Sequence, residues 1–153
     1  MSIKGWQYSC RRTDLYEYER RVKREYNNCR GMGFVYAVKI PVTHSVSLPK
    51  IGATGHLQGR FAGNFPRNTI YAVSPYHYNF FDNEDRIHTH FEKYRVPARV
   101  NAMPELFNIS TPFFFKNLPV LHYEKDKESC YVEYYGTDRM EIYTSKAYDK
   151  EEI

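Results

Sequence analysis

The sequence predicts an α+β domain in which a small three-stranded antiparallel sheet is flanked by helices. Segments rich in aromatic and β-branched residues alternate with amphipathic ones in the order β-β-α-β-α, and 153 residues suffice for one modest core. One helix precedes this order and a β-hairpin follows it. We therefore expect a helical lead-in over residues 1–30, a core domain over 31–120 and a β extension over 121–153.

The first thirty residues are predicted to hold one amphipathic helix. Apolar side chains recur at intervals of three and four from Leu15 to Tyr26, so they share a face, and Asp14 can cap the first turn. We expect this helix over residues 14–26. Its second half carries basic residues that could contact a phosphate backbone or form a solvated face at the helix end: Arg20, Arg21, Lys23 and Arg24.

Two strands and a short helix are predicted next. Residues 34–40 are rich in β-branched and aromatic side chains, which predicts a strand. Residues 48–51 form a second, shorter strand, and we expect the two to pair as an antiparallel hairpin with a long loop. A turn at residues 52–55 then leads into a short helix near residues 56–63.

The remaining elements follow from composition and capping. Residues 69–74 predict a third strand. A helix is expected over residues 82–95, because Asp82 is a good N-terminal cap and an apolar stripe follows it. Near the C-terminus, residues 130–135 and 139–143 alternate around a glycine-containing turn, which predicts a β-hairpin.

Composition narrows the class of protein. A net charge of +4 is compatible with a polyanionic partner, and the 17% of aromatic residues can fill a core or stack on bases. Cys10, Cys29 and Cys130 form no CxxC pair, so neither a zinc finger nor a disulfide framework is indicated. Walker, GxSxG and HExxH motifs are also missing. With no signal peptide and no apolar run of transmembrane length, we expect reduced thiols and a cytoplasmic or nuclear protein without a membrane partner.

Five short pieces fall in one order along the chain: Phe34-Val35-Tyr36, Lys50-Ile51-Gly52-Ala53-Thr54, Arg60, Glu84 and Glu105-Leu106-Phe107. This order resembles the GIY-YIG nuclease superfamily over roughly residues 33–107. The similarity is greatest to a short viral, phage and microbial branch in which the second motif reads Lys-Ile-Gly. The resemblance implies the β-β-α-β-α fold and hydrolysis of phosphodiester bonds in DNA, most simply double-stranded DNA, with Mg²⁺.

The resemblance also implies a role for each matching residue. Tyr36 would take the proton of the attacking water, and Lys50 on the paired strand could favour its phenolate. Arg60 would stabilise the charge on the phosphorane. Glu84 would hold Mg²⁺, and His88, one helical turn later, would help with orientation or proton transfer.

Two further residues complete the expected site, and two other functions stay open. Gly52 would let the backbone turn sharply beside the cleft, and His56 is a weaker candidate for the site. The same fold could instead serve as a catalytically silent DNA- or RNA-binding module. A third possibility is a protein-interaction domain that uses the tyrosine-rich surface and the C-terminal hairpin.

Overall fold

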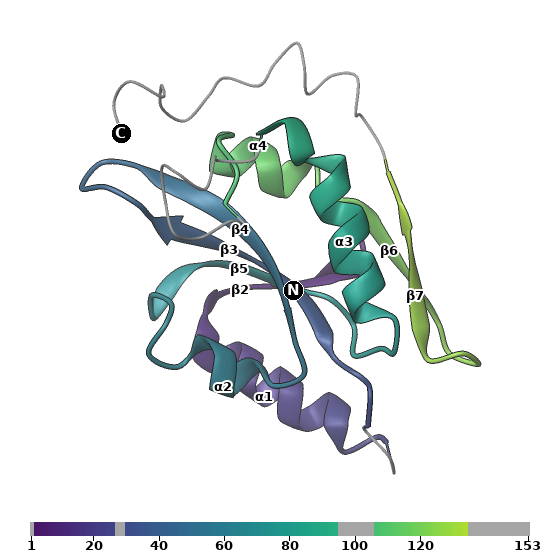
Figure 1. The fold of residues 1–153 in the computed structure, drawn as a ribbon. Helices are drawn as coiled ribbons and strands as arrows, with labels where there is room; N and C mark the ends of the chain where they lie inside the picture. Colours follow the sequence, from purple (N-terminus) through teal and green to yellow (C-terminus); the bar gives the residue numbers. More distant parts are fainter. Residues whose placement is uncertain (1, 27–29, 95–105, 135–153) are drawn as a thin grey trace.

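The computed structural model describes residues 2–26, 30–94 and 106–134, and an antiparallel sheet lies at its centre (Figure 1). The α+β class is confirmed, but the sheet has five strands where the sequence predicted three. Their order across the sheet is β1-β2-β5-β3-β4. The strands are β1 (Ser2–Ile3), β2 (Trp6–Arg11), β3 (Phe34–Pro41), β4 (Ser47–Thr54) and β5 (Asn68–Val73).

Helices cover both faces of this sheet. Helices α1 (Arg12–Lys23) and α2 (Leu57–Phe61) pack on one face, which we call the α1–α2 face (Figure 1). The other face, the α3 face, is covered by α3, α4 and a C-terminal hairpin. These elements, with the short 3-10 helix η1, are α3 (Phe80–His90), η1 (Glu92–Tyr94), α4 (Thr111–Lys116), β6 (Val120–Glu124) and β7 (Ser129–Glu133).

The two additional strands come from the segment expected to be a helical lead-in. Lys4 and Gly5 have φ values of 57° and 89°, so they form a two-residue turn in which Ile3 pairs with Trp6. Positive φ at both central residues matches the twist of a β-hairpin. Strand β2 then pairs with β5 on the far side of the sheet from β4. The predicted helix follows, two residues earlier than expected, as α1.

Strand β3 lies inside the sheet, which explains its continuous apolar run. Alternate side chains along a strand point to opposite faces. Phe34, Tyr36 and Val38 therefore enter the core on the α1–α2 face, whereas Val35 and Ala37 enter the core on the α3 face. Because β5 and β4 pair with its two sides, both faces and both edges of β3 are protected from water over residues 36–38.

Strand β4 is longer than predicted and forms the edge of the sheet beside β3. It runs from Ser47 to Thr54, so residues 52–54 continue the strand where the sequence predicted a turn. Pro49 sits within it opposite Lys39. An edge strand tolerates proline because one of its sides needs no N–H donors for a neighbouring strand.

The C-terminal hairpin differs from the prediction in its partner strand. Strand β7 covers part of the expected segment 130–135, but it pairs with β6 through a turn at residues 125–128. The second expected strand, 139–143, lies outside the described residues. The hairpin is tied to the start of α3 by Asn79, whose amide bonds both the N–H and the carbonyl of Cys130, at 3.0 and 2.7 Å.

Two findings bear on compartment and chemistry. Within the described ranges no helix is long and apolar enough to cross a membrane. Cys10 is exposed and Cys130 is buried, and both carry free thiols.

The N-terminal hairpin is fastened to the C-terminal part of the domain. The fully buried Trp6 donates its indole N–H to the carbonyl of Pro119 at 2.8 Å. The N–H of Leu121 bonds the carbonyl of Lys4 at 2.8 Å, and the Lys4 ammonium bonds the carbonyl of Lys116 at 2.8 Å. Residues more than a hundred positions apart are therefore parts of one packed unit.

Replacing Trp6 tests this link. Trp6→Ala should lower the free energy of unfolding by about 3–5 kcal/mol, because it leaves a cavity and an unpaired buried carbonyl. Urea denaturation should be followed by circular dichroism, since Trp6 is the only tryptophan. The control is Ile3→Ala. Ile3 is 46% exposed, so this substitution should lower the free energy of unfolding by no more than about 0.5 kcal/mol. Equal stability of the two variants would contradict the link.

Candidate active site

Tyr36 lies in the middle of β3 and points to the α1–α2 face. Its ring packs against Phe61 and Phe65, with centroid separations of 5.1 and 5.8 Å, and only 1% of the residue is exposed. Gly52 lies directly opposite on β4. A Cβ at position 52 would overlap the Tyr36 hydroxyl. The expected sharp turn at Gly52 is therefore wrong; this glycine lies within a strand and makes room for the tyrosine.

Lys50 lies beside Tyr36 on the same face of the sheet. Lys50 pairs with Val38. This pair is two residues along the strands from the pair of Tyr36 and Gly52, so both pairs point to the same face. Its Nζ is 5.9 Å from the centroid of the Tyr36 ring, and 7% of the residue is exposed. An ammonium over an aromatic face is a cation–π contact. The structure thus brings together the first two residues that the sequence placed in the site.

Arg60 is carried by α2 on the same side of the sheet. It is exposed, and its neighbour Phe61 packs against Tyr36. The backbone N–H of Arg60 bonds the carbonyl of His56 at 3.1 Å, which fixes it in the short helix. Arg60 is therefore held at the surface, on the helix whose Phe61 packs against Tyr36.

Glu84 and His88 reach β4 from the α3 face. The Nε2 of His88 lies 3.1 Å from the carbonyl of Ile51. A carbonyl can only accept, so Nε2 carries the hydrogen and donates it. The Glu84 carboxylate lies 4.0 Å from the same nitrogen. Since Ile51 stands between Lys50 and Gly52, this bond attaches the second pair of predicted residues to the same short stretch of β4.

The third part of the motif order also meets this stretch. Leu106 forms a β-bridge with Lys50, and the N–H of Phe107 bonds the carbonyl of Pro49 at 3.1 Å. Glu105 itself lies outside the described residues. Residues 106–107 therefore extend the sheet at the outer edge of β4.

The predicted site thus forms around an edge strand rather than in one layer. Tyr36 packs beside Lys50 and Gly52 on the α1–α2 face of β4. Glu84 and His88 lie on its α3 face, where His88 bonds the carbonyl of Ile51. Residues 106–107 lie along the outer edge of β4 at this stretch, so the two groups of predicted residues lie on opposite faces of one strand.

The basic cluster of α1 divides into two groups. Arg20, Arg21 and Arg24 are exposed, and Arg21 lies over the ring of Tyr18 at 5.6 Å. Lys23 differs, because only 22% of its side chain is exposed and its ammonium bonds the carbonyl of Gly55 at 2.8 Å. The surface of α1 therefore offers three arginines to a polyanion.

Sequence analysis missed two residues that border the site, Glu19 and Arg12. Glu19 is 7% exposed, and its carboxylate accepts the backbone N–H groups at the start of α2. Arg12 donates to carbonyls at the other end of α2. A signal was present for Glu19, which follows Leu15 by four positions and so lies on the buried stripe of α1. A carboxylate on a buried stripe needs a partner.

Glu84 is the residue that the sequence predicted to hold Mg²⁺. Among residues 2–26, 30–94 and 106–134, no group of three or more His, Cys, Asp or Glu side chains comes together. Glu84 offers a single carboxylate that is 20% exposed. Mg²⁺ is commonly held by one or two carboxylates, substrate phosphate oxygens and water. Glu84 can therefore serve a metal that arrives with its substrate.

A buried histidine orients the helix that carries Glu84. His77 is fully buried; its Nδ1 lies 2.6 Å from the carbonyl of Pro75 and its Nε2 lies 3.1 Å from the amide nitrogen of Asn83. The carbonyl requires Nδ1–H, so Nε2 accepts from Asn83. Burial lowers the pKa of His77, which keeps the ring neutral.

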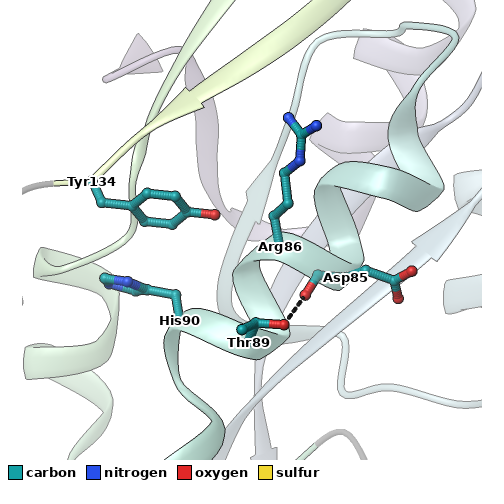
Figure 2. Close-up of a pocket in the computed structure, with 5 residues that line it drawn as sticks. All are labelled: Asp85, Arg86, Thr89, His90 and Tyr134. Atoms are coloured by element: carbon teal, nitrogen blue, oxygen red, sulfur yellow. Dashed lines mark hydrogen bonds between the residues drawn. The ribbon is translucent and has the colours of Figure 1, made fainter.

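A separate hollow lies on another side of α3 (Figure 2). Tyr134 stacks on His90 there, with ring centroids 4.5 Å apart. The hydroxyl of Thr89 donates to the carbonyl of Asp85 at 2.9 Å, and Arg86 extends beside the tyrosine (Figure 2). None of the residues that the sequence placed in the site lines this hollow.

Comparison of the chain with protein-family models, with curated proteins and with solved structures gave no match. The candidate site therefore rests on the geometry around β4 and on the order of the sequence motifs.

Two glycine substitutions test the packing of Tyr36. Gly52→Ala should lower the free energy of unfolding by about 1–3 kcal/mol, because its methyl group would displace the Tyr36 hydroxyl in a packed core. Gly59→Ala is the matched control in α2, where the nearest atom to a new Cβ is 3.8 Å away. It should stabilise the protein by up to about 1 kcal/mol. Urea denaturation measures both, and loss of stability in both variants would contradict the assignment.

The lowered pKa of His77 predicts a pH dependence of stability. Below about pH 6.5 the unfolded chain binds a proton at this position, whereas the folded protein does not until the pH reaches its lower pKa. The free energy of unfolding should therefore fall as the pH drops from 7 to 5. The fall should be smaller in His77→Gln. Burial also lowers the pKa of His90, so the part of the fall that is due to His90 should remain. An unchanged slope in the variant would remove His77 as its cause.

Proposed function

We propose that the protein is a Mg²⁺-dependent endonuclease of the GIY-YIG type that hydrolyses phosphodiester bonds in double-stranded DNA. The observation that supports the proposal is that residues 50–52 of β4 carry Lys50 beside Tyr36 on one face and are bonded through Ile51 to His88, the neighbour of Glu84, on the other. The elements β3, β4, α2, β5 and α3 occur in the β-β-α-β-α order that the resemblance implies.

Within this proposal Tyr36 is the general base. Its hydroxyl lies over Gly52, and the Lys50 ammonium stands 5.9 Å from its ring. A nearby cation favours the phenolate over the phenol, which is what a tyrosine needs to accept a proton from water. Packing against Phe61 and Phe65 fixes the ring, so the oxygen is positioned before substrate binds.

Arg60 and Glu84 deal with charge on the phosphate. The exposed guanidinium of Arg60 can donate several hydrogen bonds to the oxygens on which charge develops. Glu84 would hold Mg²⁺, which when bound supplies charge neutralisation at the leaving oxygen. His88 positions this carboxylate, because its bond to Ile51 holds one turn of α3 against β4.

The surface charge suits approach to DNA. The net charge is +4, and Arg20, Arg21, Arg24 and Arg60 are exposed on the side of the sheet that bears α1 and α2. Contacts of this kind release counterions from DNA, so binding should weaken steeply as salt is raised.

A binding module without catalysis is the second candidate. It is favoured by the burial of Tyr36, which is 1% exposed and fills a core between Phe61 and Phe65. In that case the tyrosine is structural and the exposed arginines bind nucleic acid without cutting it.

Cleavage of supercoiled plasmid separates the two candidates. Wild type should nick it in Mg²⁺ and not in EDTA. Tyr36→Phe should slow nicking by about 10²–10⁴-fold through loss of the base, and Arg60→Gln by about 10²–10³-fold through loss of charge stabilisation. Glu84→Gln should abolish the response to Mg²⁺. The matched control is Asp85→Asn, the exposed neighbour on another side of α3, which should nick at the wild-type rate.

The same preparations should be tested for binding to labelled duplex DNA over a range of salt. Wild type that shifts DNA in a salt-dependent way but never cuts it, with binding unchanged by Glu84→Ala, would establish the binding module and refute the nuclease. Absence of both binding and cleavage would refute both candidates.

A further inference from the structure

Helix α2 is too short to hold itself in place. It spans Leu57–Phe61, contains Gly59, and its N-cap residue His56 makes no side-chain capping bond. An isolated helix of this length is unstable in water, and glycine weakens it further. Nevertheless it carries Arg60, so the position of this guanidinium depends on contacts from elsewhere in the fold.

One support comes from Glu19 of α1, at the N-terminal end of α2. Its Oε2 accepts the N–H of Leu57 at 2.7 Å, and its Oε1 accepts the N–H of Gln58 at 3.2 Å. These are N–H groups that a helix cannot satisfy from within its own first turn. The carboxylate is 7% exposed, so water competes little for these bonds.

The opposite support comes from Arg12, the first residue of α1, at the C-terminal end of α2. Its Nη1 donates to the carbonyl of Phe61 at 3.1 Å and to that of Phe65 at 2.9 Å. An anion therefore stands at the N-terminal end of α2 and a cation at its C-terminal end, which is the favourable arrangement for a helix. Both groups belong to α1.

Lys23 completes the connection. Its Nζ lies 3.1 Å from Glu19 Oε2, 2.8 Å from the carbonyl of Gly55 and 3.2 Å from Nδ1 of His56. It thus balances the buried carboxylate and fixes the turn between β4 and α2 at the same time.

We infer that α1 positions Arg60: Glu19 and Arg12 clamp the two ends of α2 and so hold the helix that carries Arg60 on the α1–α2 face of the sheet. Glu19, Arg12 and Lys23 are positioning residues in this assignment, since they act through α2. The catalytic consequence rests on the proposed function, whereas the clamp itself does not. The basic half of α1 then has two tasks, with Lys23 directed at the fold and Arg20, Arg21 and Arg24 at the solvent.

Trypsin provides a test of the clamp that is independent of catalysis. It cuts after Arg60 only when α2 opens, because Phe61 is fully buried. Glu19→Gln should raise the rate of this cut about threefold to thirtyfold, the range expected for loss of a helix cap. Glu17→Gln, the same charge change at an exposed site of α1, should leave it unchanged. Cutting after Arg86 on α3 is the internal control, since global unfolding would accelerate both cuts.

A second pair of variants tests the other end and guards against loss of the fold. Arg12→Gln should accelerate the cut after Arg60, whereas Arg11→Gln, at the exposed neighbouring position, should not. Glu19→Asp keeps the charge near Lys23 but shortens its reach, so its cutting rate should lie between those of wild type and Glu19→Gln. Wild-type cutting rates in Glu19→Gln and Arg12→Gln would overturn the clamp.

Nicking kinetics test the link to catalysis. Glu19→Gln should lower kcat more than it raises KM for DNA, because Arg60 is displaced whereas Arg20, Arg21 and Arg24 still face the solvent and can contact DNA. An opened α2 with wild-type kcat would overturn the positioning role. If wild type does not nick DNA, the proposed function fails, and the trypsin rates still decide whether α1 holds Arg60.

Discussion

The hydrogen-bonding needs of the outer edge of β4 organise the site. The carbonyls of Pro49 and Ile51 lie beyond the last full strand pairing, and unpaired buried carbonyls are costly. The N–H of Phe107 satisfies the first and His88 satisfies the second. The hydrogen bond from His88 to Ile51 thereby holds α3, which also carries Glu84, against the strand that carries Lys50 and Gly52. These two hydrogen bonds, together with apolar packing, fix the positions of α3 and of Phe107 along β4.

The elements that were predicted correctly are those whose signal is local. Strands β3 and β5 match to within one residue, and helix α1 begins two residues and ends three residues earlier than predicted, because composition and spacing within each segment determine them. Strand β2 was missed because polar residues such as Gln7 and Ser9 interrupt its pattern, and its partner β5 lies about sixty residues away. The start of α3 was placed two residues late because Asp82 was taken as its N-terminal cap, whereas the helix begins at Phe80 after Asn79, whose side chain bonds Cys130 and makes no cap.

The candidate site shows the same division between local and long-range information. The order of motifs in the sequence selected Tyr36, Lys50, Arg60 and Glu84, and the structure places these residues on neighbouring elements. It could not indicate that Gly52 makes room for a tyrosine hydroxyl, since that depends on the register between β3 and β4. Glu19 and Arg12 were beyond its reach for a similar reason: their partners are backbone groups of α2, and backbone groups leave no mark in a sequence.

The contacts between the N-terminal hairpin and residues 116–121 have a consequence for the stage of synthesis at which the core can close. Trp6 is synthesised 113 residues before Pro119, the acceptor of its indole N–H. Strand β2 likewise can pair with β5 only after β5 has been synthesised. The full set of contacts of residues 4–11 can therefore form only after residues 116–121 have been made, and closure of the core is a long-range event of the kind that slows folding.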